Sequence, residues 1–235
     1  MNVQIFAKGA GFAAFAALAI SACSSGGPET AFAGSSTEKK SAAVQDQAST
    51  AAEQTAALRF ALAPTGNTAR YRVRERLVGR DLPNDAIGET KALAGVISFD
   101  SKGKVIREGS KFTVDASTFV SDMNRRDGFV RGRLLEADQY PSVVLVPTEI
   151  RGVSLPLPKS GSVPIEMTAD LTVRDVTRPT IWKGTAQFED GRITGSAATS
   201  FTFDEFQMEQ PRVPVLLSVA DTIRLEIDFN LIQQK

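Results

Sequence analysis

The chain has 235 residues, 27 basic and 27 acidic, so its net charge is zero, and it contains no histidine and one cysteine. Nucleic-acid binders need a basic face, so we expect no nucleic-acid partner. The missing histidines remove the commonest general base and metal ligand, and one cysteine can form neither an intramolecular disulfide nor a zinc cluster. The chain also lacks G-x-S-x-G, HExxH and P-loop motifs. We therefore expect no enzyme, no metal and no cofactor.

The first 22 residues have the form of a secretory signal peptide, with a charge at Lys8 and a small apolar run over 9–20 that is too short to span a membrane. The run ends in Ile20-Ser21-Ala22-Cys23, which resembles the bacterial lipobox, so we expect Cys23 to be lipidated. The signal predicts a bacterial periplasmic protein anchored by lipid to a membrane, and Ser24 favours the outer membrane. The alternative is a cleaved, soluble periplasmic protein.

Residues 23–57 comprise the lipidated cysteine and a segment rich in Ser, Ala, Thr, Gly, Gln and Glu, with little to bury. This composition predicts a flexible tether, which would let a folded domain over 58–235 stand off a membrane.

Apolar and polar residues alternate in the folded part, as in strands with one buried face. The alternation predicts strands over 69–78, 93–99, 111–115, 142–150, 165–173, 180–188, 193–203 and 223–231. Small residues such as Gly195 indicate a crowded or bent stretch in strand 193–203. No strand–helix alternation appears, so we expect an all-β fold in which about eight antiparallel strands close into a barrel. Closure would also remove the sheet edges that invite aggregation.

One charged segment, RRDGFVRGRLLEADQYP over 125–141, interrupts the strands. We expect it to form a helical lid over one end of the barrel, with Asn124 as its N-cap. Gly132 weakens a helix by about 1 kcal/mol relative to alanine, so the lid should consist of two short pieces. The apolar residues expected to point inward from it are Phe129, Val130 and Leu134.

Three stretches resemble motifs of the YceI-like lipid/polyisoprenoid-binding family. Arg126-Asp127, then Phe129-Val130-Arg131 and Tyr140-Pro141, is similar to the family's RD-x-HLRS…YP segment. The stretch DLTVRDVTRP over 170–179 resembles its G-LTIRGVTKP hairpin, and FDEFQM over 203–208 resembles its R-x-DFGM stretch. FTVDAST over 112–118 fits the strand before the first motif, and all occur in the family's order between about residues 59 and 232.

The resemblance implies an extended eight-stranded antiparallel barrel of lipocalin-like form, with a helical insertion after the third or fourth strand. It also implies a secreted periplasmic carrier that encloses an isoprenoid or fatty amphiphile in an apolar tunnel. The chain departs from the family in lacking histidines in the first strand, so a role that depends on them does not transfer. Asp175 stands where the family has a turn glycine, and Asp175 can occupy a left-handed turn position.

The apolar residues on the inward faces of the predicted strands and lid could line a ligand tunnel, or they could form a packed core that binds nothing. The resemblance favours the tunnel, as does the preference of ligands for concave apolar pockets. The candidate ligand-binding residues are Phe112, Val114, Phe129, Trp182, Phe188, Phe201, Phe203, Ile223, Leu225, Ile227 and Phe229.

Arg126 and Arg131 are candidates for binding an anionic head group, because guanidinium groups match phosphate geometry. The alternative, which we favour, is that Arg126 pairs with Asp127 or another acid and pins the lid.

These patterns together predict a membrane-anchored periplasmic carrier that sequesters one long apolar molecule inside a barrel. The rival hypothesis is a stress-protection or protein-interaction module with a filled barrel and no ligand. An enzyme acting on the sequestered lipid is a weaker third possibility, without a supporting motif.

Overall fold

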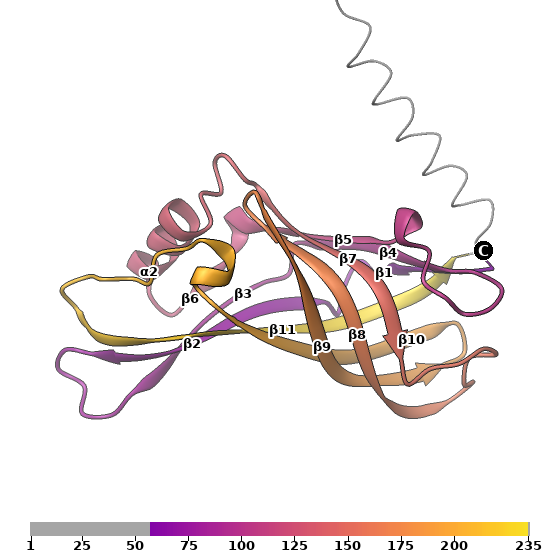
Figure 1. Cartoon of the computed structure of the whole chain (residues 1–235). Helices are drawn as coiled ribbons and strands as arrows, with labels where there is room; N and C mark the ends of the chain where they lie inside the picture. The colour runs from indigo at the N-terminus through magenta and orange to yellow at the C-terminus, as the bar shows by residue number, and fades with distance from the viewer. Residues whose placement is uncertain (1–56, 235) are drawn as a thin grey trace, which may run out of the picture.

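The strands of this chain form a closed antiparallel barrel, described over residues 57–234 by a computed structural model (Figure 1). In chain order the strands are β1 (Leu58–Leu62), β2 (Thr68–Leu77), β3 (Asn84–Thr90), β4 (Leu93–Phe99), β5 (Lys111–Asp115), β6 (Val120–Ser121), β7 (Ser142–Arg151), β8 (Gly161–Val173), β9 (Val176–Glu189), β10 (Arg192–Thr202) and β11 (Leu216–Gln234). The helical segments are η1 (Arg107–Gly109), η2 (Ala116–Thr118), α2 (Asn124–Phe129), the π-helical turn η3 (Val130–Leu134) and η4 (Asp204–Phe206).

The barrel closes in the order β1-β4-β5-β7-β8-β9-β10-β11, with β11 pairing back to β1. Three of the barrel strands are each made of two pieces separated by a short interruption, namely β1 with β2, β3 with β4, and β5 with β6. The second set of pieces pairs in the same order as the first, because β2 pairs with β11 and β3, and β3 pairs with β6. The molecule is therefore an eight-stranded antiparallel barrel in which three strands are broken, with the helical insertion after the third. This confirms the predicted fold class.

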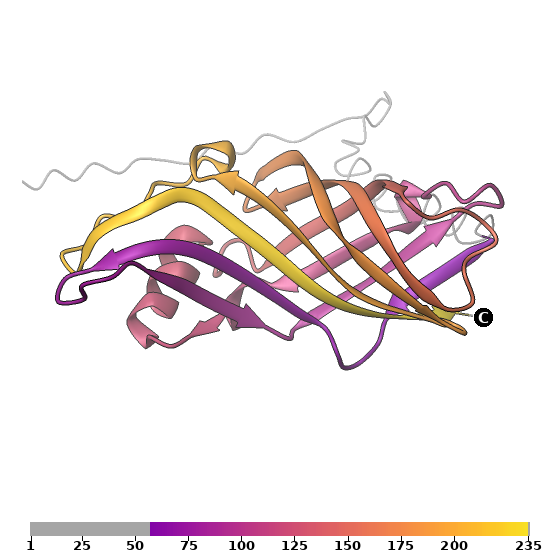
Figure 2. The same ribbon diagram turned by 90° about the horizontal axis from the view of Figure 1, so that it is seen from below.

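β11 is the strand that gives the barrel its elongated form (Figure 2). One of its edges pairs with β10 from Thr222 to Ile232. Its other edge pairs first with β2 and then with β1, where Gln234 lies opposite Arg59. The β2–β3 hairpin and the start of β11 consequently project at the lid end, whereas the beginning and end of the described chain meet at the opposite end.

Glycines permit close contact between β9 and β10. A Cβ atom on Gly195 would lie 2.1 Å from the carbonyl oxygen of Thr185, and one on Gly184 would lie 1.9 Å from that of Ser196. No side chain fits at such distances, so the crowding expected for strand 193–203 is present.

The side chains alternate between the two faces of the wall as the sequence predicts. Inward residues of β7 to β11 form the main apolar cluster, and Phe60, Ile97 and Val105 form a second one. On the outer face of β2, Arg70 pairs with Glu89 and Asp228. The barrel interior is thus mainly apolar, and ion pairs lie on its outer face.

Two local predictions were wrong. The N-cap of α2 is Met123, without a side-chain cap, and Asn124 is the first helical residue. In the β8–β9 turn the left-handed residue is Arg174, with φ 56°, rather than Asp175. The expectation of two lid pieces holds only in part, because α2 passes directly into the π-helical turn η3 that contains Gly132, so the helix type changes while the helical segment is continuous.

No helix within residues 57–234 has the length and apolar character needed to cross a membrane. The predicted signal peptide, Cys23 and nearly all of the predicted tether lie outside the described residues.

Candidate functional site

The lid end of the barrel contains a cavity of about 440 Å³. Its walls are apolar side chains from β2, β5, β7, β8, β9, β10 and β11, and the lid contributes to its roof. The candidate residues that border it are Val114, Phe129, Trp182, Phe201, Phe203, Ile223, Leu225 and Ile227. The cavity reaches solvent at the lid end, because exposed Arg125, Pro214 and Val215 also line it.

A second apolar cavity of about 110 Å³ lies nearer the opposite end. It is bordered by the remaining apolar candidates, Phe112, Phe188 and Phe229, and by Leu155 and Leu157 of the β7–β8 connection. Ile227 borders both cavities, so the two spaces lie in sequence along the barrel interior. A barrel packed solid from end to end does not fit this structure.

Trp182 presents an apolar surface to the larger cavity because its one polar atom is satisfied within the wall. Its indole nitrogen donates to the hydroxyl of Thr180 at 2.9 Å, and that hydroxyl donates to the carbonyl of Ala169 at 3.0 Å. Buried tryptophan requires such a partner for its N–H. The side chain is 4% exposed, and it is the only tryptophan in the chain.

The lid is held by a buried carboxylate in its first turn. Asp127, which is 4% exposed, accepts hydrogen bonds from the backbone nitrogen of Ser121 at 2.8 Å and from its hydroxyl at 2.6 Å. These bonds attach α2 to β6 and turn the apolar residues of the lid inward. Phe129, Val130 and Leu134 all border the cavity, as expected.

Arg126 connects the lid to β2 through a buried ion pair. Its Nη2 lies 2.6 Å from Oε1 of Glu75, and the two side chains are only 11% and 7% exposed. Nη1 also pairs with Asp122. Burial opposes the charge of Arg126, but the carboxylates of Asp122 and Glu75 outweigh it and raise its pKa. Arg126 therefore pins the lid, although its partners are Glu75 and Asp122 rather than Asp127.

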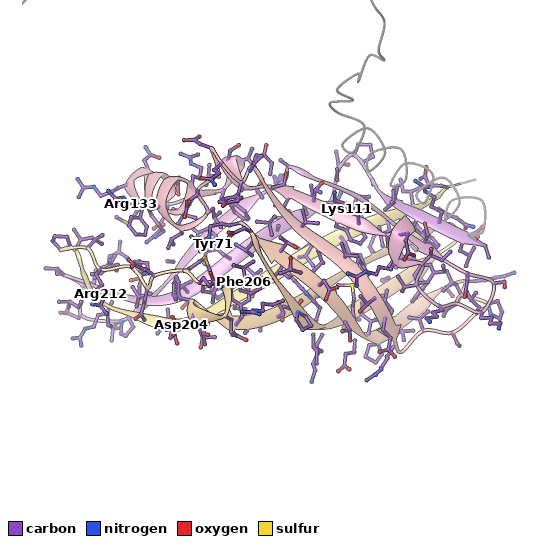
Figure 3. The ribbon with its side chains drawn as sticks, turned by 45° about the horizontal axis from the view of Figure 1, so that its top comes forward. Tyr71, Lys111, Arg133, Asp204, Phe206 and Arg212 are labelled. Atoms are coloured by element: carbon purple, nitrogen blue, oxygen red, sulfur yellow. The ribbon has the colours of Figure 1, made fainter. Side chains whose placement is uncertain are left out.

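Arg131 and Arg133 lie outside the cavity lining. Arg131 donates to the carbonyl of Ser117 at 3.5 Å, and Arg133 is exposed and points away from the barrel (Figure 3). Of the two head-group candidates, only Arg126 borders the cavity, and it is already paired with acids.

Tyr71, which lies on β2, lines the larger cavity (Figure 3). Its ring lies 5.7 Å from that of Phe119 and covers Gly88, where a Cβ would come within 2.3 Å of the ring. Burial raises the pKa of Tyr71 to about 12.

A second attachment of the lid was not predicted. Arg174 donates to Glu136 at 2.7 Å, to the carbonyl of Phe206 at 3.1 Å and to that of Gln207. It therefore joins the β8–β9 turn, the end of the lid and η4. Phe206 below it is fully buried, with its ring 4.5 Å from that of Phe201.

Sequence analysis also missed the contribution of the segment between η4 and β11. Pro211 and Val213 of this segment line the cavity together with Leu216, the first residue of β11, and Met123 and Leu135 line it from the lid. The aliphatic run VPVLL over 213–217 was the available signal. Among the described residues no group of three or more Cys, Asp or Glu side chains is placed to hold a metal ion.

A closed antiparallel barrel with an apolar cavity under a helical lid defines the lipocalin-like class of hollow barrels. Within that class, the model of the YceI-like domain matches residues 39–231, and the chain belongs to this family.

Two solved structures share the fold. A polyisoprenoid-binding domain from Saccharophagus degradans is 12% identical with a TM-score of 0.58, covering 75% of this chain and 99% of its own. BcnA from Burkholderia cenocepacia is 14% identical with a TM-score of 0.54, covering 72% and 98% respectively. The comparison with curated proteins gave no match.

Proposed function

We propose that this protein is a periplasmic, membrane-anchored carrier that sequesters a polyisoprenoid or another long-chain amphiphile inside its barrel. The observation that carries the proposal is the apolar cavity of about 440 Å³ that opens at the lid end. Ligand sites typically enclose roughly 300–1,000 Å³ and are lined mainly by apolar and aromatic side chains. The similar barrel from Saccharophagus degradans, described as polyisoprenoid-binding, supports the ligand class.

The shape of the interior favours a long, thin tail over a compact ligand. A tail that enters at the lid end passes Phe201 and Leu225, and beyond Ile227 it meets the smaller cavity. Each CH₂ group transferred from water to such walls contributes about 0.8 kcal/mol, so affinity should rise with chain length. The polar end of the ligand would remain at the mouth, near Arg125 and Arg126.

Lipid analysis of the protein purified without detergent tests this proposal against the filled-barrel module. We expect native mass spectrometry to show a bound mass, and solvent extraction to release an isoprenoid or acyl compound. A protein that is consistently ligand-free, and that takes up no such compound when it is supplied, would overturn the carrier function. The YceI-like fold is that of a binding protein, and we propose no reaction for it.

The anchoring part of the proposal rests on the sequence alone. Ile20-Ser21-Ala22-Cys23 supplies the lipidation signal, and Ser24 favours retention at the outer membrane. The variant Cys23→Ser should move from the membrane fraction to the soluble fraction, because it can carry no acyl chain. A variant that stays with the membrane as firmly as the unaltered protein after its signal segment has been removed would contradict lipid anchoring.

A further inference from the structure

Aliphatic side chains are exposed at one end of the barrel, on two segments that we call the tip: residues 76–83 of the β2–β3 hairpin and residues 209–217 before and at the start of β11. The exposed fractions are 59% for Val78, 77% for Leu82, 38% for Val215 and 58% for Leu217. These are four of the six large apolar residues most exposed among residues 57–234. Their concentration at one end indicates an interaction surface.

The two segments of the tip are joined to one another and to the cavity mouth. The backbone nitrogen of Val78 donates to the carbonyl of Val215 at 3.0 Å, and Leu77 lies opposite Leu216 in the sheet. Leu77, Val213 and Val215 also line the larger cavity. The tip is therefore the rim of the opening through which a ligand would pass.

Within residues 57–234, the arginines on the tip are not paired with carboxylates, unlike those on the outer wall of the barrel. Arg70, Arg72 and Arg74 on the outer wall are each paired with carboxylates. The exposed arginines at the lid end that have no ion pair within 4.0 Å in the described chain include Arg76, Arg80 and Arg212 on the tip, Arg125 and Arg133 on the lid, and Arg178 beside the β8–β9 turn.

The tip itself carries two acids, Asp81 and Glu209, against three arginines, and Asp122 beside it is taken by Arg126. The other exposed acids at this end lie away from the tip segments, on the end of the lid, the β8–β9 turn, η4 and β11, and they are Asp138, Asp175, Asp204, Glu205 and Asp221. Arg133 and Arg212 lie at the same end of the molecule and face solvent (Figure 3). Within the two tip segments, three arginines without an ion pair and two acids thus flank the exposed aliphatic residues, which leaves the tip with a small excess of positive charge.

We propose that the tip docks on an anionic lipid bilayer. Leu82, Val78 and Leu217 would enter the headgroup region, while the surrounding arginines would contact lipid phosphates. Aliphatic side chains ringed by basic residues bind such surfaces through apolar burial together with electrostatic attraction. Docking would place the cavity mouth directly against the bilayer, so a lipid tail could move between the two without crossing water.

Docking of the tip on a bilayer does not require that the barrel binds a lipid. Only the suggested transfer of a lipid tail between bilayer and cavity rests on the proposed carrier function. The other occupant that an exposed apolar surface could accept is a second copy of this chain. Two copies would bring the same unpaired arginines together, which repel one another, whereas anionic headgroups complement them.

A single fluorophore at the tip tests the proposal directly. Cys23 is the only cysteine, so the full chain carrying Cys23→Ser accepts one new cysteine for an environment-sensitive dye. The test variant is Leu82→Cys. The matched control is Ile181→Cys, because Ile181 is 55% exposed on the outer wall of β9. Because each dye reports its own surroundings, contact between vesicles and the N-terminal segment does not imitate docking of the tip.

With phosphatidylcholine vesicles containing phosphatidylglycerol, emission from position 82 should shift to the blue and that from position 181 should not. Removing arginines by Arg76→Ser, Arg80→Ser or Arg212→Ser should weaken partitioning about fivefold each, from about 1 kcal/mol per arginine near an anionic surface. Arg192→Ser, in the exposed turn region at the opposite end, should leave it unchanged.

Three results would overturn the proposal. One is an unchanged spectrum at position 82 with anionic vesicles, and another is an equal shift at position 181. The third is a shift at position 82 that grows with protein concentration in the absence of vesicles, which would identify a second copy of the chain as the occupant. None of these results would bear on whether the barrel holds a ligand.

Discussion

Replacing Leu225 with aspartate should remove the ligand from the barrel while leaving the barrel folded. Leu225 lies on β11 opposite Thr199 and Tyr71, is half-buried and borders the larger cavity. A ligand tail entering past an aspartate would strip water from an unpaired carboxylate, at a cost of at least about 3 kcal/mol. This cost corresponds to a roughly hundredfold increase in Kd.

The loss of stability should be smaller than the loss of binding. Fully buried leucines cost about 2–5 kcal/mol when truncated, and a side chain that already faces empty space belongs at the lower end of that range. Phe201 is less suitable for this test, because it is 6% exposed and packs against Phe206, so its removal would cost about 3–5 kcal/mol.

The assay combines native mass spectrometry of retained ligand with thermal unfolding. The matched control is Ser200→Asp, because Ser200 is exposed on the outer face of β10, beside Arg224. We expect Ser200→Asp to retain its ligand and Leu225→Asp to lose it with its unfolding transition still cooperative. If Leu225→Asp folds and keeps a full load of ligand, the cavity is not the binding site.

Three further predictions concern the ion pair of the lid, the tyrosine of the cavity wall and the close contact of β9 with β10. Glu75→Gln should lower the free energy of unfolding in urea by about 3 kcal/mol, because it leaves Arg126 buried with only part of its partners. The control Asp122→Asn changes a side chain that is 64% exposed and should cost less than about 1 kcal/mol, so equal effects of the two variants would refute the buried pair. Ultraviolet titration should show one tyrosine that ionises at about pH 12, and this signal should be absent from Tyr71→Phe. Tyr71 should also make the free energy of unfolding fall as pH rises from about 10 towards 12, because the folded state keeps a proton that the unfolded chain releases. Gly195→Ala should cost about 1–3 kcal/mol by calorimetry, since its Cβ would lie 2.1 Å from a backbone oxygen of β9, and a neutral effect would contradict the close strand contact.

The barrel could be predicted because most of its strands place large apolar residues on one face. Trp182 and Phe188 on β9, with exposed Ile181 and Lys183 near them, show the period of two that residue types reveal directly. β3 was missed for the opposite reason. Its buried residues are Ala86, Gly88 and Thr90, which are small because Tyr71 covers Gly88, and small residues give no hydrophobic alternation.

The first seven residues of β11 were missed because the register there is irregular. The pairing with β2 shifts between Leu216 and Ser218 and again between Val219 and Ile223, which interrupts the alternation at Asp221. The same irregular stretch carries part of the cavity rim and the tip. Sequence periodicity therefore found the wall of the site and missed its mouth.

The ion pairs of the lid depended on contacts that residue types alone do not define. Arg126 could be assigned an acid partner, but Glu75 is 51 positions away in the sequence, and its proximity follows from the pairing of β2 with β11 and from the position of α2. Similarly, Arg174 reaches Glu136 and η4 only after three loops have met at one end of the barrel.

The most direct measurement of the central claim is quenching of Trp182 by a brominated long-chain lipid. Trp182 is the only tryptophan, is almost inaccessible to solvent and borders the larger cavity, so a bromine atom can quench it efficiently only from inside the barrel. We expect saturable quenching that is reversed by an unbrominated isoprenoid and abolished in Leu225→Asp. Emission that stays constant across the titration, while the delipidated protein remains folded, would contradict a hollow, lipid-binding barrel.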